Sequence, residues 1–179
     1  MPRLRPWFIL AVLIGFAGSA QAQQPEVALG IKPHPRGHLS REQLQAVAKD
    51  IHALEANPLA SDVMEARRAL LIWLIESPDV TVKVCPGLEQ PFTESNSRYH
   101  SEMMGQLIFS SAAYVIEHPD QARDLARVGA GGLEGVLTTY AVLKAQQGDA
   151  ATDEFVERLA SIRERGGLEE FARQATTGC

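Results

Sequence analysis

The sequence contains little cysteine and few aromatic residues, and it has no hydrophobic run long enough to cross a membrane as a helix. Only two of the 179 residues are cysteines, and 6% are aromatic. The longest apolar run, residues 7–16, is about half of the ~20 residues that a membrane span needs. Cys-x-x-Cys, Cys-x-x-Cys-His and glycine-rich nucleotide-binding motifs do not occur, so the sequence lacks the patterns of dithiol enzymes, c-type haem proteins and nucleotide-binding proteins.

Residues 1–22 have the three parts of a cleavable export signal. Arg3 and Arg5 give a positively charged start, the apolar run follows, and residues 20–22 form an A-x-A cleavage site. We therefore expect a mature chain that begins at Gln23 and lies in the periplasm of a bacterium or in the medium. A retained membrane anchor is the alternative, which the short apolar run disfavours.

The expected mature chain is acidic and has the size of one domain. Removal of the signal leaves 157 residues with a net charge of −7, because two arginines leave with it. That length is enough for a single domain with a buried core. An acidic protein with scattered charges binds nucleic acid and anionic membranes poorly, so we expect no nucleic-acid partner and no stable membrane anchor after cleavage.

The two cysteines, Cys85 and Cys179, both lie in the expected mature chain. In an oxidising compartment an even pair most simply forms a disulfide, and intermolecular pairing or free thiols are the alternatives. Closing a loop of nearly a hundred residues is assigned about 4–5 kcal/mol by the chain-entropy model. Neither cysteine has a sequence context that lowers a thiol pKa, so we predict a structural link from the C-terminus to the middle of the chain.

Hydrophobic periodicity predicts an all-α fold, a compact bundle of five to seven helices that forms one domain over residues 40–179. The first helix is expected to begin at Ser40, which forms a capping box with Gln43. It should end at Asn57, because the residue before Pro58 is disfavoured in a helix. Further helices are expected over residues 59–76, 97–117, 119–147, 153–165 and 168–175.

Three of these helices carry more specific expectations. The C-terminal half of the helix over 59–76 is apolar nearly all round, which predicts deep burial. The helix over 119–147 contains four glycines, so we expect two helices with a tight bend near residues 129–132; close approach of another backbone is the alternative. Thr152 is the expected cap of the helix over 153–165.

Two segments lack a helical pattern. Residues 23–39 hold three prolines and two glycines, and they predict a flexible linker. Residues 79–96 begin with valines that alternate with polar residues and continue through Cys-Pro-Gly. Since the chain offers no second strand for a sheet, we expect an extended segment that lies over the helices.

The most hydrophobic helix, over 97–117, carries a stripe of polar side chains, and these are the main candidates for function. The stripe consists of Glu102, Gln106, Ser110 and Tyr114, spaced by four residues, with Glu117 close beyond. Under an enzymatic interpretation Glu102 is a general base and His100 its acid–base partner. A narrow solvent face, or polar partners inside the bundle, is the alternative explanation. Glu134, which lies among the glycines of the helix over 119–147, is a further weak candidate for binding.

Patterns for metals and cofactors are weak. His34 and His38 provide at most half a metal site in the predicted linker. His100 together with Met103 would suit copper, but methionine at helical spacing is more often part of a core. We therefore predict no metal and no cofactor.

The favoured function is non-enzymatic: an exported soluble helical protein that binds another protein or a component of the cell envelope. No set of residues at a telling spacing completes a catalytic mechanism, which favours binding over chemistry. Two alternatives stay open. One is a small envelope hydrolase that uses Glu102 and His100, and the other is a periplasmic metal-handling protein.

Overall fold

The computed structural model describes residues 28–179, and every regular element in that range is a helix. The predicted signal peptide lies outside the described residues. No helix within 28–179 combines the length and the apolar character that crossing a bilayer requires. The elements are α1 (Arg41–Ala56), α2 (Val63–Glu76), α3 (Pro86–Thr93), α4 (His100–Glu117), α5 (Leu125–Gln147), the 3-10 helix η1 (Gly148–Ala151), α6 (Glu154–Glu164) and α7 (Leu168–Ala175).

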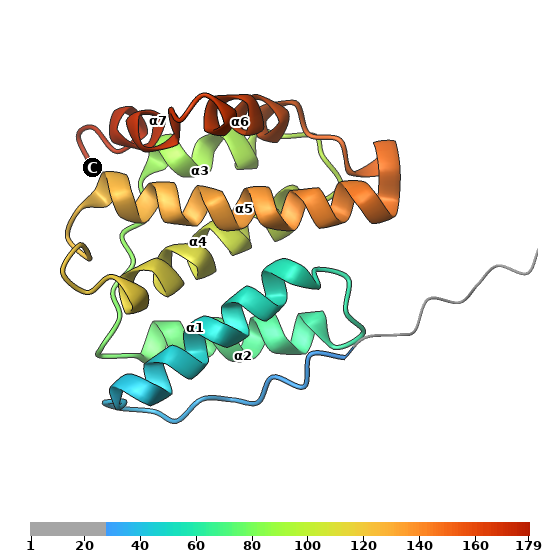
Figure 1. Cartoon of the computed structure of the whole chain (residues 1–179). Coiled ribbons are helices and arrows are strands. Elements are labelled where there is room, and N and C mark those ends of the chain that lie inside the picture. The colour runs from blue at the N-terminus through green and yellow to red at the C-terminus, as the bar shows by residue number, and fades with distance from the viewer. Residues whose placement is uncertain (1–27) are drawn as a thin grey trace, which may run out of the picture.

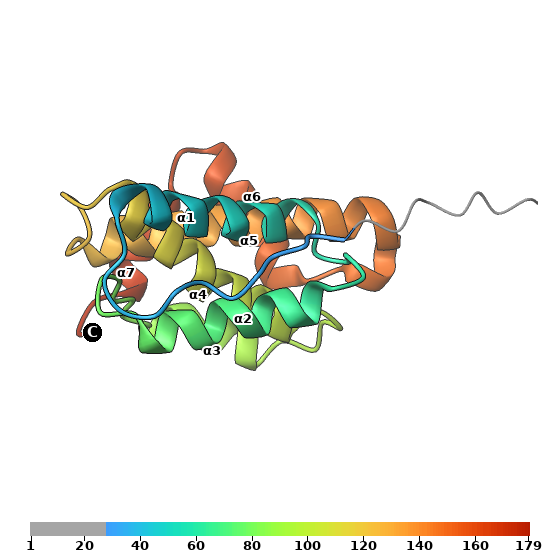
Figure 2. The ribbon, with the colours of Figure 1, turned by 90° about the horizontal axis from the view of Figure 1, so that it is seen from below.

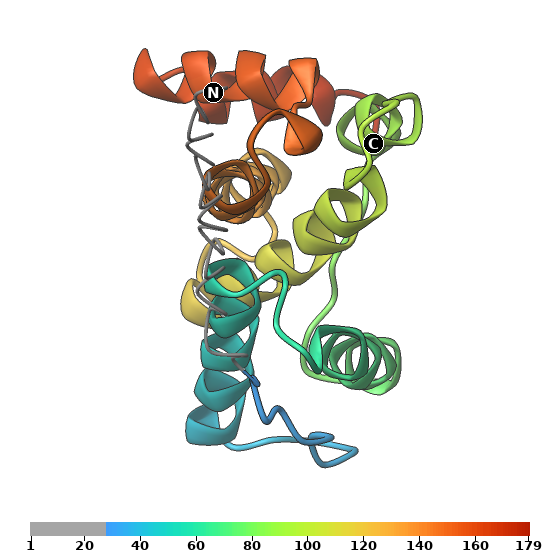
Figure 3. The same cartoon turned by 90° about the vertical axis from the view of Figure 1, so that its right-hand side faces the viewer.

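The helices form three layers, which confirms the predicted all-α bundle. Helices α4 and α5 lie in the middle, with α1 and α2 on one side and α3, α6 and α7 on the other (Figure 1). The view along the middle layer shows the same arrangement (Figure 3). The core is divided accordingly: one cluster joins α3, α5, α6 and α7 to the N-terminal part of α4, and the other joins α1 and α2 to its C-terminal part.

Helix α5 is continuous, so the predicted bend near residues 129–132 is wrong. Three of its glycines, Gly131, Gly132 and Gly135, face α4 at close range, which is the alternative that the sequence left open. A Cβ atom at Gly131 would collide with the Tyr114 ring, and one at Gly135 would collide with the Ser110 side chain. The cost of glycine in a helix is offset here by the close packing of the two central helices.

The segment 79–96 is extended only in its first part, and the prediction of an extended segment throughout is wrong. Helix α3 begins directly after Cys85, with Pro86 in its first turn, where the missing N–H of proline costs nothing. Leu88 and Phe92, one turn apart, are both buried. Burial of these two side chains stabilises a helix too short to form alone.

The predicted disulfide between Cys85 and Cys179 is confirmed, with the two Cα atoms 5.6 Å apart. It ties the residue before α3 to the last residue of the chain, which follows α7. The two helices also approach closely at Gly87, where a Cβ atom would collide with the carbonyl oxygen of Ala175. A disulfide between residues so far apart in sequence fits a protein that works outside the reducing cytoplasm.

Helix α2 is buried on one side only, so the prediction of deep burial for its C-terminal half is wrong. Leu70 and Trp73 pack into the core. Leu71, Ile72 and Ile75 are exposed to solvent on the opposite side. No other described segment covers this face.

The helix starts follow local side-chain chemistry, with two corrections. The capping box of Ser40 and Gln43 is present, as predicted. Asp153 caps α6, in place of the predicted Thr152, by accepting from the N–H groups of residues 155 and 156. Asp124 caps α5, so this helix begins after the turns of residues 118–124 and not at Pro119.

Residues 28–39 run as extended chain beside α1 and α2 (Figure 2). The Asp62 carboxylate accepts from the backbone N–H groups of Leu29 and Gly30, each over 2.7 Å. The Asp79 carboxylate accepts from the N–H of Leu39, also over 2.7 Å. The two backbone hydrogen bonds hold the pKa of Asp62 below its ordinary value. The pKa of Asp79 is also lowered, first by the hydrogen bond with His38 Nδ1 at 2.7 Å and then by that with the N–H of Leu39.

Candidate functional site

Two of the predicted site residues are buried between α1, α4 and α5. Gln106 is fully buried and Ser110 nearly so. Gln106 Nε2 donates to Ser110 Oγ over 3.0 Å, and Ser110 Oγ donates to Glu55 Oε1 over 2.6 Å. Polar partners inside the bundle, one of the two alternative explanations of the polar stripe, therefore account for this part of α4.

His52 of α1 extends this network to the end of α4. Its Nδ1 lies 2.8 Å from Glu55 Oε2, and its Nε2 lies 2.9 Å from Glu117 Oε1. Burial lowers the pKa of His52, but the hydrogen bonds to the two carboxylates outweigh it and raise the pKa above the ordinary value of 6.5. The two carboxylates, one beside each ring nitrogen, stabilise the protonated imidazolium relative to the neutral ring.

A cavity of about 450 Å³ opens beside this network, and it gathers four of the predicted residues. They are Ser110, Tyr114, Glu117 and Glu134. His52 and Glu55, which also line it, were missed as site residues because α1 alone gives no sign that it faces the polar stripe of α4. The charged groups here are paired: Glu134 with Arg163 at 3.6 Å, and Glu169 with Arg173 at 2.7 Å.

The network does not form a nucleophile with a base. Ser110 Oγ donates to a carboxylate and not to an imidazole, and its residue is only 3% exposed. A serine hydrolase needs a histidine that takes the proton of the hydroxyl and a hydroxyl that a substrate can reach. The arrangement joins α1 to α4 and is structural.

His100 and Glu102 do not take part in either cavity. His100 Nδ1 lies 2.8 Å from the carbonyl oxygen of Ser97, a residue in the turn that precedes α4. Within residues 28–179, no three His, Cys, Asp or Glu side chains come close enough to hold a metal ion. The catalytic role of this pair stays a prediction: the charge of Glu102 acts on the buried guanidinium of Arg67, and within residues 28–179 neither His100 nor Glu102 is hydrogen-bonded to a hydroxyl group.

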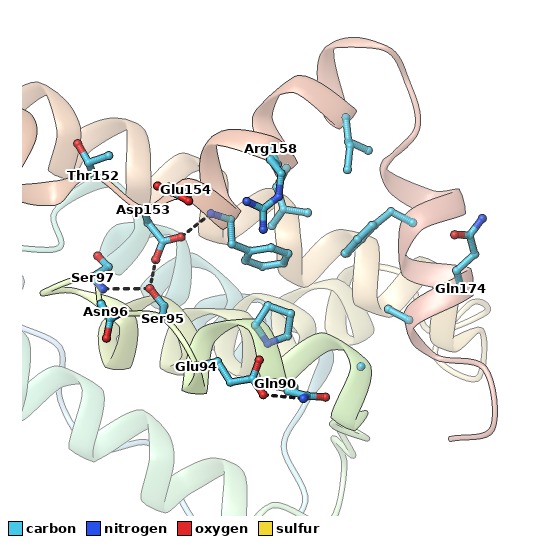
Figure 4. A pocket seen from close by; sticks show the side chains of 17 residues that line it. Gln90, Glu94, Ser95, Asn96, Ser97, Thr152, Asp153, Glu154, Arg158 and Gln174 are labelled. Atoms are coloured by element: carbon cyan, nitrogen blue, oxygen red, sulfur yellow. Dashed lines mark hydrogen bonds between the residues drawn. The ribbon is translucent and has the colours of Figure 1, made fainter.

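A second and larger cavity, of about 950 Å³, lies between α3 on one side and α6 and α7 on the other (Figure 4). We call it the α3–α6 groove. Its floor is apolar, and its rim consists of polar side chains from all three helices and from the α3–α4 connection. The floor is formed by Pro91, Phe155, Leu159, Ile162 and Phe171, and the rim includes Gln90, Glu94, Asn96, Glu154, Arg158 and Gln174.

Asp153 fixes one end of the groove. It is 3% exposed, it caps α6, and its Oδ2 accepts from Ser95 Oγ over 2.5 Å (Figure 4). Its own N–H donates to Tyr140 Oη over 3.3 Å. Burial, together with the hydrogen bond to Glu157, raises the pKa of Tyr140 to about 12. Asp153 thereby joins the α3–α4 connection, α5 and α6 at one point.

The aromatic side chains of the groove are held by contacts with one another. The ring of Phe155 lies edge-on to that of Phe92, with the ring centroids 5.1 Å apart. The centroid of the Phe155 ring is also 6.1 Å from that of Phe171. The Arg158 guanidinium lies over the Phe155 ring at 5.8 Å. Arg158, Asn96 and Glu154 form no side-chain hydrogen bond or ion pair within residues 28–179. The groove therefore offers an apolar floor next to polar groups that are free to bind.

The sequence does not predict this groove. One of its walls is α3, which the sequence predicted as extended chain, and its other wall is built from two helices predicted as ordinary core elements. The nearest signal was the pair of phenylalanines, Phe155 and Phe171, in a chain with few aromatic residues. Their spacing of sixteen residues shows no common face until the fold brings α6 and α7 together.

Known proteins do not help to choose between the two cavities. Comparison with known protein families, with curated proteins and with solved structures finds no match. The choice therefore rests on shape and chemistry. The α3–α6 groove is the larger, and it has free polar groups, whereas the charged groups of the smaller cavity are paired. We take the groove as the candidate functional site.

Proposed function

We propose that this protein is exported, acts in the bacterial periplasm or the medium, and binds a segment of another protein in the α3–α6 groove without catalysing a reaction. The predicted signal in residues 1–22 and the Cys85–Cys179 disulfide both support export. The groove supports binding, because pockets that combine an apolar surface with a few polar groups are typical of ligand sites.

The observation that carries the proposal is the unpaired Arg158 beside the phenylalanine floor of the groove. A partner segment with an apolar side chain would cover Phe155 and Phe171. An acidic side chain next to it would pair with Arg158, which has no carboxylate partner within the described residues. The free amide of Asn96 would bind the backbone of an extended segment.

Catalysis in the groove has little support. The lining contains no histidine and no cysteine. Its buried carboxylate, Asp153, is occupied as the cap of α6 and as the acceptor for Ser95. The free carboxylate of the lining, Glu154, forms no hydrogen bond with a hydroxyl group within residues 28–179, so the groove shows no nucleophile paired with a base, which covalent mechanisms require.

The test uses bulky substitutions on the rim of the groove. Gln90→Trp and Gln174→Trp change exposed side chains and should leave the fold intact. Each protein is immobilised and incubated with envelope extract, and the retained proteins are identified by mass spectrometry. We expect the native protein to retain a stoichiometric protein partner that both variants lose.

The matched control is Gln146→Trp, an exposed position of α5 that lies outside the groove. This variant should retain the partner. Equal retention by all four proteins would place binding elsewhere and contradict the proposal. Retention of glycan fragments in place of a protein, lost in the same two variants, would also contradict it and would assign the groove to an envelope saccharide.

A further inference from the structure

Helix α2 displays an apolar stripe that the rest of the structure leaves uncovered. Five large hydrophobic side chains are exposed among residues 28–179, and four of them belong to α2. Met64 is 68% exposed, Ile75 75% and Leu71 44%. Ile72, which is 42% exposed, lies beside this line. The C-terminal half of α2 is apolar nearly all round, and such a segment is normally buried on all sides, so this face indicates an interface.

The stripe has the spacing of a coiled-coil seam. Met64, Arg68, Leu71 and Ile75 follow one another at intervals of four, three and four residues, which is the alternation of the two core positions in a heptad. The seam extends over almost the whole of α2. It therefore matches a helix of similar length, and a second α2 is such a helix.

We propose that α2 is the interface of a two-fold dimer, in which it packs antiparallel against α2 of a second copy of this chain. A parallel pair would bring Arg68 against Arg68 of the second copy, and two like charges at one core position are unfavourable. In an antiparallel pair centred between residues 69 and 70, Met64 is level with Ile75 of the second copy. Arg68 is then level with Leu71 of that copy, along which its aliphatic stem can pack.

The charges beside the seam favour the same arrangement. Arg36 pairs with Glu76 of its own chain at 2.8 Å, at the C-terminal end of α2. In the antiparallel pair, Glu65 and Arg68 of one copy come to the same end as Glu76 and Arg36 of the other. Arg68 of one copy and Glu76 of the other lie about 8 Å apart along the helix axes, at 1.5 Å per residue. Because side chains of a helix lean toward its N-terminus, these two side chains lean toward each other. Each end thus gathers two carboxylates and two guanidinium groups.

The first test is the mass of the mature chain, measured by sedimentation equilibrium over a range of concentrations. We expect a dimer, and we expect Ile75→Lys to raise its dissociation constant by about 30-fold or more. Leu59→Lys is the matched control: it changes an exposed aliphatic residue that precedes the helix, and it should dimerise like the native protein. A native chain that stays monomeric at every concentration overturns the proposal.

The second test distinguishes antiparallel from parallel packing. Met64→Cys and Ile75→Cys are made as separate variants, mixed and oxidised, and the mixture should give a cross-link between the two variants. Cross-linking of Met64→Cys with itself, and not with Ile75→Cys, would contradict the antiparallel arrangement. The charge reversals Arg68→Glu and Glu76→Arg should each weaken the dimer, and combining them should restore it.

A lipid surface is the other occupant that the test can identify. The native chain is mixed with vesicles of phosphatidylglycerol and phosphatidylethanolamine, and bound protein is separated by flotation. Monomeric protein that floats with the vesicles, and loses this binding in Ile75→Lys, would overturn the dimer and assign the stripe to a membrane. The groove is on the opposite side of the bundle, so none of these outcomes depends on the function proposed for it.

Discussion

The two outer layers of the bundle are held by different sets of links, and among residues 28–179 only one of the two sets includes a covalent bond. On the side of α3, α6 and α7, the links include the disulfide, which ties the start of α3 to the chain end after α7, and the edge-on and tilted contacts among Phe92, Phe155 and Phe171. On the side of α1 and α2, they are side-chain hydrogen bonds and ion pairs, among them those of His52, Asp62 and Asp79. Each side also buries its own apolar cluster.

The difference follows from helix length. Helices α3 and α7 have eight residues each, which is too short for a stable helix in isolation. Helices α1 and α2 have 16 and 14 residues, and each presents a longer buried stripe. The covalent link therefore joins α3 and α7, the two helices that are least stable by themselves, and both of these helices line the groove.

Removal of the disulfide should have the largest effect, and it should fall mainly on one side. For Cys85→Ser combined with Cys179→Ser, we expect a loss of up to about 4–5 kcal/mol in the free energy of unfolding. Urea denaturation measures the loss. Hydrogen exchange should rise first in α3 and α7, which lose their common anchor, while α1 keeps its protection. An equal rise of hydrogen exchange in α1 and in α3 and α7 would contradict this prediction.

A methyl group at Gly135 should loosen the middle layer on the side of α1. Gly135→Ala places a Cβ atom against Ser110 Oγ and Glu55 Oε1, and overpacking of this kind costs about 1–3 kcal/mol. The control is Gly105→Ala in α4, where a Cβ atom meets nothing within 4 Å. That substitution should stabilise the helix by about 1 kcal/mol. Thermal unfolding measures both variants, and we expect a lower melting temperature for Gly135→Ala and a higher one for Gly105→Ala.

Loss of the Asp153 cap should weaken the groove side by a smaller amount. We expect Asp153→Ala to cost about 1–2 kcal/mol, because two N–H groups of α6 and the hydroxyl of Ser95 lose their acceptor. Thr152→Ala, at the position that the sequence predicted as the cap, should cost less than half as much. Chemical denaturation of the two variants compares them, and equal losses would contradict the assignment of the cap.

The smallest effect should be a dependence of stability on pH through His52, on the side of α1. Its pKa is raised in the folded state, so the stability that it contributes is complete below the unfolded pKa of about 6.5 and is lost as the pH rises through the higher folded value. Half of the side chain is exposed, so the contribution should be below about 1 kcal/mol. Denaturation of the native protein and of His52→Gln from pH 5 to 9 measures it, and parallel curves would exclude the contribution.

The parts of the fold that the sequence predicted are those decided by local chemistry. The capping box at Ser40, the end of α1 at Asn57 and the bounds of α7 depend on residues within a few positions of one another. The disulfide followed from the number of cysteines and the predicted compartment. The continuity of α5 was not predictable, because its glycines are explained only by contacts with other helices, such as those of Gly131 with Tyr114 and of Gly135 with Ser110.

The candidate site shows the same limit. The polar stripe of α4 led to Ser110, Tyr114 and Glu117, and the structure brings them together with Glu134 in one cavity. His52 completes that group from a helix whose orientation the stripe does not reveal. The α3–α6 groove has no continuous sequence signal, since its walls come from segments more than fifty residues apart.

Taken alone, the sequence determined the helical class, the single disulfide and the C-terminal ends of most helices. Periodicity and capping depend on residues close together in the chain, and two cysteines leave only one intramolecular pairing. Tertiary structure decided which polar residues are buried and paired, why α5 contains glycines, and where the groove lies. It also decided that one apolar face of α2 stays exposed, although its composition predicts burial. Burial depends on what packs against a residue, and contacts between distant segments decide that.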